Sequence, residues 1–235
     1  MKVRCGIIIF LFAIVLTLSF SLNAVAMTTG FEVNPVETDN NIGIKIENKE
    51  YHSVSIKCFD VSDTGLIAIG TDEGSEKHVN LYDNNGTFKY GYSFTDYGTY
   101  GVGFDDESIL IYISRGEAAY LVDRQGNCLE KCDIINNIEN NSYWNNVVFA
   151  KTKESSGNKY YLSKSPGLLG MVSPFYSRLI KKELNGEETI LLDVSNEHDV
   201  YITSLIIVFI IVISISIVVV KNFGQKINLH FDKKY

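Results

Sequence analysis

A run of 20 residues without a charge, residues 201–220 (YITSLIIVFIIVISISIVVV), constrains this 235-residue chain more than any other feature. At about 1.5 Å per helical residue the run is roughly 30 Å long, which is the thickness of the hydrocarbon core of a bilayer. A buried helix of a soluble domain rarely runs this long without a polar face. The run therefore predicts a C-terminal transmembrane helix in contact with membrane lipid.

The first 26 residues have the features of an export leader. Lys2 and Arg4 make a basic start, residues 5–22 are uncharged and mostly apolar, and residues 24–26 read Ala-Val-Ala. That small-x-small ending is the pattern of a signal-peptidase site. We expect residues 1–26 to be a cleaved signal peptide. Because the apolar run is long, an uncleaved anchor helix is the alternative.

Charges on the two sides of the C-terminal run set the expected orientation. Residues 221–235 carry four lysines and one aspartate, whereas residues 193–200 carry three acidic residues and no Lys or Arg. Lys and Arg are retained on the cytoplasmic side of a membrane. These charges predict a cell-membrane protein with one span, or two if the leader is kept. Residues 27–200 would lie outside and the short basic tail in the cytoplasm.

The expected outer region is long enough for one domain with its own core, or for two small ones. Residues 27–200 contain 15 Lys and Arg against 27 Asp and Glu, a net charge of −12. Such a charge repels the phosphate backbone, so the composition argues against nucleic-acid binding.

The middle of the chain alternates in the manner of short β-strands. Between positions 88 and 94 an aromatic residue stands at every second position. This period of two places four aromatic side chains on one face of a strand. The Phe-Asp pair of residues 59–60 recurs at 104–105, and LYDNNG at residues 81–86 is matched by LVDRQG at 121–126.

The two matched units, residues 53–94 and 98–134, resemble blades of NHL- or WD-type β-propellers. The shared order is an inner strand, a turn with Asp and Gly, an apolar strand, a hairpin and a strand ending in Asp-x-x-Gly, without the Trp-Asp ending of WD40 blades. The resemblance implies an all-β exported domain of propeller-like antiparallel sheets between the leader and the C-terminal helix. Because propellers host many activities, it implies no catalytic residue, cofactor or metal.

A third, degraded unit is expected over residues 144–193. A strand at residues 147–150 would pair with one at 160–162 across a turn at 155–158, and Asn-Gly at residues 185–186 marks a further hairpin. Three blades cannot close a ring, which usually needs four to eight. The domain is therefore an open stack of sheets, a sandwich of similar hairpins, or a partial propeller completed by another chain.

Three cysteines, Cys58, Cys128 and Cys132, lie in the expected outer domain. An odd number leaves at least one thiol unpaired or bonded to another chain. On a regular strand, Cys128 and Cys132 would face the same way, about 13 Å apart, which is too far for a disulfide. We expect buried, unpaired thiols instead of a redox or metal pair.

Motifs of common catalysts are scarce in this sequence. Neither G-x-S-x-G nor H-E-x-x-H occurs. Ser156 and Lys159 fit S-x-x-K, but the Gly and Asn between them predict a hairpin turn, whereas the acyl-enzyme motif needs a helix. The acidic run at residues 105–107 offers oxygen ligands for calcium, but a solvated turn between strands is the favoured interpretation. We predict no catalytic, cofactor-binding or metal-binding residue.

Residues 165–176 (SPGLLGMVSPFY) depart from the strand pattern, because they are apolar, uncharged and hold two of the three prolines. The favoured interpretation is a core loop packed under the sheets. The alternative is an exposed loop that contacts a partner or the membrane surface.

Together these patterns favour a non-enzymatic, membrane-anchored binding or assembly module that engages a protein partner or a second copy of itself. A surface hydrolase is the first alternative, and it would need two carboxylates about 5 to 10 Å apart. The candidates are Asp60, Asp63, Asp105 and Asp106. A sensor subunit coupled to a cytoplasmic partner is the second alternative.

Overall fold

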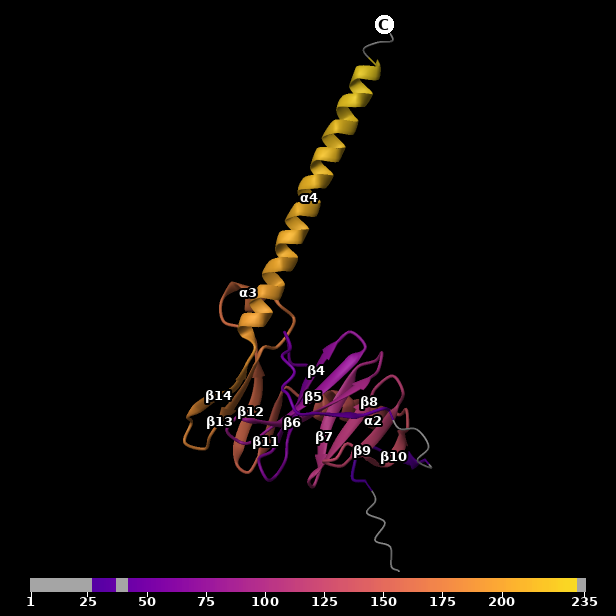
Figure 1. The fold of residues 1–235 in the computed structure, drawn as a ribbon, viewed down its shortest axis with the longest axis vertical. Helices are drawn as coiled ribbons and strands as arrows, with labels where there is room; N and C mark the ends of the chain where they lie inside the picture. The colour runs from indigo at the N-terminus through magenta and orange to yellow at the C-terminus, as the bar shows by residue number, and fades with distance from the viewer. Residues whose placement is uncertain (1–26, 37–41, 232–235) are drawn as a thin grey trace, which may run out of the picture.

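The computed structural model describes residues 27–36 and 42–231, so the leader predicted at residues 1–26 lies outside the described residues. Three antiparallel β-sheets are stacked side by side, and one long helix, α4 (Ser195–Phe231), extends away from them (Figure 1). The prediction of mostly antiparallel β-structure followed by a C-terminal apolar helix is therefore confirmed.

Sheets 1 and 2 have the same construction, which explains why their sequences repeat. In each, four strands pair in chain order and a short N-terminal strand joins the outer edge. Sheet 1 contains β3 (Cys58–Val61), β4 (Ile67–Glu73), β5 (Glu76–Tyr82) and β6 (Phe88–Thr95), with β2 (Lys45–Glu47) beside β6. Sheet 2 contains β7 (Tyr100–Asp105), β8 (Ser108–Ile113), β9 (Ala118–Val122) and β10 (Cys128–Ile134), with β1 (Val33–Pro35) beside β10.

Sheet 3 is a meander of four strands without an added edge strand. It contains β11 (Thr152–Ser155), β12 (Asn158–Ser163), β13 (Arg178–Lys182) and β14 (Glu188–Asp193). The strand predicted at residues 147–150 is wrong, because Trp144–Val148 forms a π-helix, η1, that continues α2 (Ile138–Tyr143). The strand that pairs with β12 is β11.

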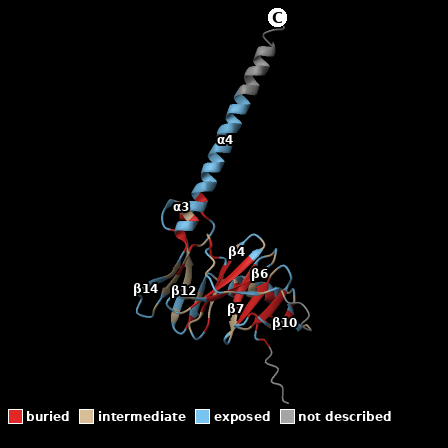
Figure 2. Ribbon diagram, in the orientation of Figure 1, coloured by how far each residue is buried: buried red, intermediate tan, exposed pale blue. Residues whose placement is uncertain are grey.

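Sheet 1 lies in the middle of the stack. Its strand β3 contacts β7 of sheet 2 and β11 of sheet 3. One apolar core joins sheets 1 and 2 around Tyr92 and Tyr100, and a second joins sheets 1 and 3 around Phe59, Tyr160 and Leu179. Figure 2 shows that buried residues are concentrated in sheets 1 and 2. The described residues form an open stack of three sheets and not a sandwich, and completion of that stack by another chain stays a prediction.

The outer face of sheet 2 is covered by segments that do not belong to any sheet. Phe31 packs edge-on against Tyr112 of β8, with 5.3 Å between ring centroids, and lies 4.9 Å from the ring of Trp144 in η1. Val148 of η1 approaches Gly101 of β7 so closely that a Cβ atom at position 101 would overlap with it. A further blade would therefore find this apolar face already occupied.

A β-bulge in β6 turns one aromatic side chain to the face opposite to the predicted one. Tyr90, Tyr92 and Phe94 of β6 face the core between sheets 1 and 2, as their period of two requires. Phe88 packs instead on the core between sheets 1 and 3. The register of β5 against β6 shifts so that Lys89 has no partner residue, and one extra residue reverses the alternation. The prediction of four aromatics on one face was wrong at Phe88.

The uncharged segment at residues 165–176 contains the short helix α3 (Leu168–Val172), which contacts α4. Leu168 and Met171 are 80% and 78% exposed, and Phe175 is 37% exposed. The interpretation of this segment as a core loop is therefore wrong for its apolar side chains, and contact of the loop with a partner or the membrane stays a prediction.

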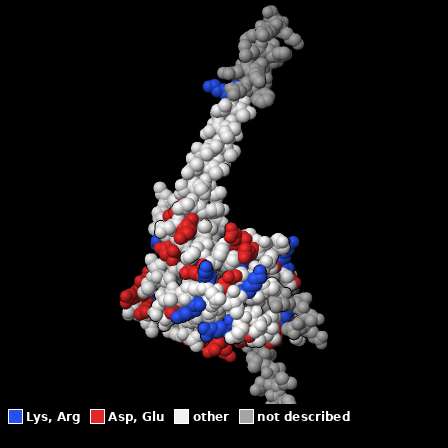
Figure 3. Space-filling model, viewed as in Figure 1, with Lys and Arg blue, Asp and Glu red and all other residues white. Residues whose placement is uncertain are grey.

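Helix α4 is, within the described residues, the one helix long and apolar enough to cross a membrane. Its first turns are seated on the sheets, where His198 is fully buried and its ring Nδ1 lies 3.0 Å from the carbonyl oxygen of Val54. Ile202, one turn later, is also buried. From residue 203 to residue 221 the side chains are exposed, and Figure 3 shows the uncharged surface of α4 above the charged surface of the sheets.

Candidate binding face

Several turns gather at the end of the stack opposite to α4. The segment before β3 bonds to His198 of α4, so β3 runs away from that helix and ends at the turn of residues 62–65. Because neighbouring strands are antiparallel, the turns at residues 83–86, 105–108 and 123–126 lie at the same end. We refer to this end as the turn face.

Asp60 links strands of all three sheets close to the turn face. One carboxylate oxygen accepts a hydrogen bond from the backbone N–H of Phe104 in β7 at 3.0 Å. The other lies 2.8 Å from Nζ of Lys153 in β11, and the side chains of Asp60 and Lys153 are only 20% and 14% exposed. Both oxygens therefore act as structural acceptors.

The other three carboxylates considered for hydrolysis have separate surroundings. Asp105 accepts a hydrogen bond from the backbone N–H of Thr28 at 2.9 Å. Asp63 and Asp106 are exposed in turns, and Asp106 has a positive φ of 52°. The structure thus brings the four predicted residues to one end of the molecule. The local geometry of a turn or strand explains why each carboxylate stands where it does.

Two aspartates at equivalent positions hold the Asp-x-x-Gly turns of sheets 1 and 2. Oδ1 of Asp83 accepts hydrogen bonds from the backbone N–H groups of Asn85 and Thr87 at 3.0 and 2.9 Å, and Oδ2 lies 2.9 Å from Nζ of Lys89. Hydrogen bonding to Lys89 and to the turn backbone lowers the pKa of Asp83 to about 2. For Asp123, partial burial raises the pKa, but hydrogen bonds from its own turn outweigh this and lower it.

We expect acid to destabilise the turn face through Asp83 and Asp123. Both have a lower pKa in the folded than in the unfolded chain, so the ionised carboxylates stabilise the fold above their ordinary pKa of about 4. This stabilisation is lost as the pH falls toward about 2. The melting temperature of Asp83→Asn should therefore fall less than that of the unaltered chain on acidification through this range. Equal acid sensitivity of the two proteins would contradict this.

A recess of about 690 Å³ lies on the turn face between sheets 1 and 2. Its walls come from equivalent turns, with Asp83 on the side of sheet 1 and Asp123 on the side of sheet 2. Leu66 and Tyr90 supply apolar surface. The guanidinium of Arg124 lies 5.3 Å from the ring centroid of Tyr90, which is a cation–π distance.

The recess has a mainly acidic lining with apolar patches. Four carboxylates and two cations line it: Asp83, Asp106, Glu107, Asp123, Lys89 and Arg124. A second recess of about 310 Å³, which Asp60 and Asp63 help to line, shares three of its residues and continues the surface toward sheet 3. This combination suits a partner segment that brings positive charge and an apolar side chain.

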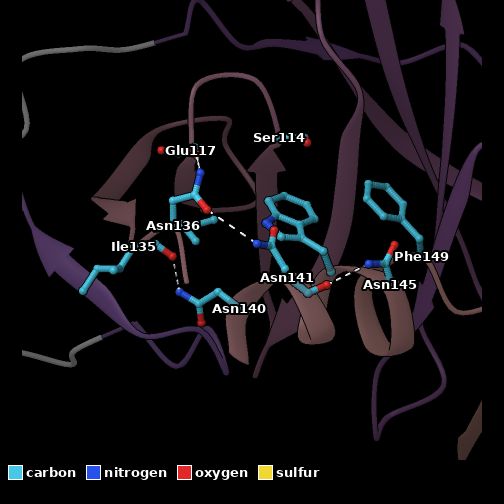
Figure 4. Close-up of a pocket in the computed structure, with 10 residues that line it drawn as sticks. Ser114, Glu117, Ile135, Asn136, Asn140, Asn141, Asn145 and Phe149 are labelled. Carbon is cyan, nitrogen blue, oxygen red and sulfur yellow. Dashed lines mark hydrogen bonds between the residues drawn. The ribbon is translucent and has the colours of Figure 1, made fainter. Parts of the chain in front are cut away.

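A different cavity, of about 300 Å³, lies at the edge of sheet 2 and is lined by several asparagines (Figure 4). The buried side chain of Asn140 donates to two backbone carbonyl groups at 2.8 and 2.7 Å, and Asn136 donates to Glu117 at 2.6 Å. The ring of Trp144 stacks on Phe149. These contacts fasten α2 and η1 to sheet 2, so we assign the cavity a structural role.

The described cysteines are free thiols, as expected. Burial raises the pKa of Cys58 to about 12 and that of Cys132 to about 11, which keeps both protonated and unreactive. Cys128 and Cys132 do not face the same way, because a bulge after Cys128 places them against different cores. That part of the sequence prediction was wrong.

Sequence reasoning did not identify the recess or its lining residues Lys89, Tyr90 and Arg124. The available signal was the alignment of the two repeats, since these side chains stand in or just beyond the equivalent turns of residues 81–86 and 121–126. The alignment predicts that the turns share an end of the domain, but not that space is left between them.

Comparison with known proteins leaves the function to be argued from this geometry. No protein-family model matches the sequence, and no curated protein matches it. A solved structure of the Neurospora crassa Pan2 WD40 domain is similar at 12% sequence identity over 69% of this chain, with a TM-score of 0.25. The match spans 45% of that domain's chain. At this TM-score the likeness carries no argument about function.

Proposed function

We propose that this chain is a non-enzymatic, membrane-anchored binding module. Helix α4 spans the membrane, residues 27–200 lie outside, and the turn face binds a protein partner. The observation that carries the proposal is the position of the 690 Å³ recess, at the end of the stack opposite to α4. A partner outside the membrane has free access to that end. The acidic lining favours a basic segment of the partner.

The surface hydrolase is less well supported. Glycoside hydrolysis needs one carboxyl group that acts as an acid and a second that acts as a base or nucleophile. Asp60 is engaged at both oxygens, and hydrogen bonds keep the pKa of Asp83 and of Asp123 low, which opposes proton donation at neutral pH.

Site-specific photocrosslinking in intact membranes tests the binding function. A crosslinking residue at Asn84 or Gln125, which are exposed at the rim of the recess, should trap a discrete partner. The matched control is Ile138, which is 83% exposed on α2, away from the turn face. Glu107→Lys, which places a positive charge in the acidic lining, should abolish the crosslinks from the rim. Crosslinks that form equally from Ile138, or none from either rim position, would reject the proposal.

The contacts of Met27 with sheet 2 support removal of the leader. The side chain of Met27 is buried against sheet 2, its backbone nitrogen lies 2.7 Å from a carboxylate oxygen of Glu130, and Thr28 bonds to Asp105. These contacts fix residue 27 beside the turn face. The five peptide units from residue 22 to residue 27 reach at most about 18 Å, which is shorter than the roughly 20 Å length of a six-residue strand. A leader helix at residues 5–22 would thus not reach the bilayer that holds α4. N-terminal sequencing should find Met27 first.

The joint between sheet 3 and α4 favours the sensor subunit as a second candidate. Asp193 ends β14, pairs with Arg178 at 2.9 Å, and accepts a hydrogen bond from the backbone N–H of Ser195 at the start of α4. A rigid joint of this kind would pass a tilt of the sheets to the helix. An unaltered cellular response after deletion of residues 222–235 would exclude this function.

A further inference from the structure

Helix α3 lies beside the first turns of α4, at the end of the stack opposite to the turn face (Figure 1), and two of its apolar side chains are exposed. Leu168 and Met171 are three residues apart and therefore share one face of the short helix. No residue between 165 and 176 carries a charge. Helix α3 thereby adds a second apolar surface beside that of α4.

The loop that carries α3 is held firmly in this position. The ammonium of Lys164 donates to the carbonyl oxygen of Ser173 at 2.7 Å, which closes the base of the loop. The buried hydroxyl groups of Ser165 and Ser177 are 2.9 Å apart. Gly170 packs so tightly on the backbone of Ser165 that no side chain would fit. Exposure of Leu168 and Met171 is therefore a property of the folded loop.

We propose that α3 is a second membrane contact, which inserts Leu168 and Met171 into the lipid surface beside the span. This proposal rests on the proposed function, because the surface that α3 contacts is the bilayer that α4 spans. The uncharged part of α4 begins at Val200, in the turns that α3 contacts, so the lipid surface lies at the level of this loop. Phe175 and Tyr201, both partly exposed at this end, have the aromatic character favoured at a membrane interface.

A second contact gives the anchor a function that one helix cannot supply. A single span fixes the height of the sheets above the bilayer but leaves their tilt and rotation free. Contact of α3 with lipid on one side of α4 removes that freedom. The turn face is then held pointing away from the membrane, where the recess remains open to a partner.

Tryptophan scanning with brominated lipids tests this contact in the full-length chain, which contains one native tryptophan, Trp144. Leu168→Trp is compared with Leu184→Trp, because Leu184 is 86% exposed in the β13–β14 hairpin at the turn face. Phe209→Trp, within the span, reports insertion of α4 itself. Each variant is reconstituted into phosphatidylcholine vesicles with or without bromine on the acyl chains.

We expect the added emission of Leu168→Trp to be blue-shifted and quenched by bromine near the headgroups, and that of Leu184→Trp to be unaffected. Quenching of Phe209→Trp but not of Leu168→Trp would overturn the contact of α3 with lipid and leave the anchoring by α4 intact. A protein that covers α3 would give this same result. Quenching of neither would show that α4 does not span, which is a failure of the proposed function. Equal quenching of Leu168→Trp and Leu184→Trp would also overturn the proposal.

Discussion

Replacement of Asp60 by alanine should lower the free energy of unfolding by about 3 kcal/mol, which is the lower end of the range for removing one partner of a buried ion pair. Lys153 would keep its charge between sheets 1 and 3, and the backbone N–H of Phe104 would lose its acceptor. Because β3, β7 and β11 belong to three different sheets, the loss should appear as one cooperative transition. Denaturant unfolding of the chain in detergent, followed by near-UV circular dichroism, measures it.

The matched control is the ion pair of Lys182 and Glu188 in sheet 3. Its atoms are 3.1 Å apart, a distance similar to that at Asp60, but both side chains are 46% exposed. Glu188→Ala should therefore lower the stability much less than Asp60→Ala does. Asp60→Asn, which keeps an acceptor for Phe104, should fall between the two alanine variants. If Asp60→Ala cost no more than Glu188→Ala, the link between sheets would be energetically unimportant.

The features that could be predicted from the sequence are those set by short-range chemistry. An Asp that accepts hydrogen bonds from the next turn residues, followed by Gly at positive φ, fixes a turn locally, and this occurs at Asp83-Gly86 and Asp123-Gly126. The repeat of these turns therefore predicts the repeat of the two meanders. The 20-residue uncharged run predicts the long helix in the same way, because composition and length alone decide it.

The features that could not be predicted depend on contacts between distant residues. Val147 and Val148 have high β-propensity, yet they lie in η1, because burial of Val148 against Gly101 favours the helix. Phe88 changed face through a single extra residue in β6, which no pattern in the sequence marks. Asp60 and Lys153 are 93 residues apart, so their pairing follows from the stacking order of the sheets.

Truncation of Phe31 to alanine should cost about 3 to 5 kcal/mol, the usual range for removing a buried aromatic side chain. Phe31 is 8% exposed and lies at the centre of the cover on sheet 2, with its ring 4.5 Å from that of Tyr143 and 5.3 Å from that of Tyr112. Removal opens a void between sheet 2 and α2. The same denaturant titration measures the change.

The control for this substitution is Ile138→Ala, on the same helix that Phe31 packs against, since Ile138 is 83% exposed and should cost less than about 0.5 kcal/mol. Loosening the cover also uncovers Leu110 and Leu121 on the outer face of sheet 2. An uncovered apolar sheet face binds another copy, so we expect Phe31→Ala, but not Ile138→Ala, to self-associate in light scattering. A monomeric, fully stable Phe31→Ala protein would mean that sheet 2 needs no cover, and the stack would then be open to a further blade on that side.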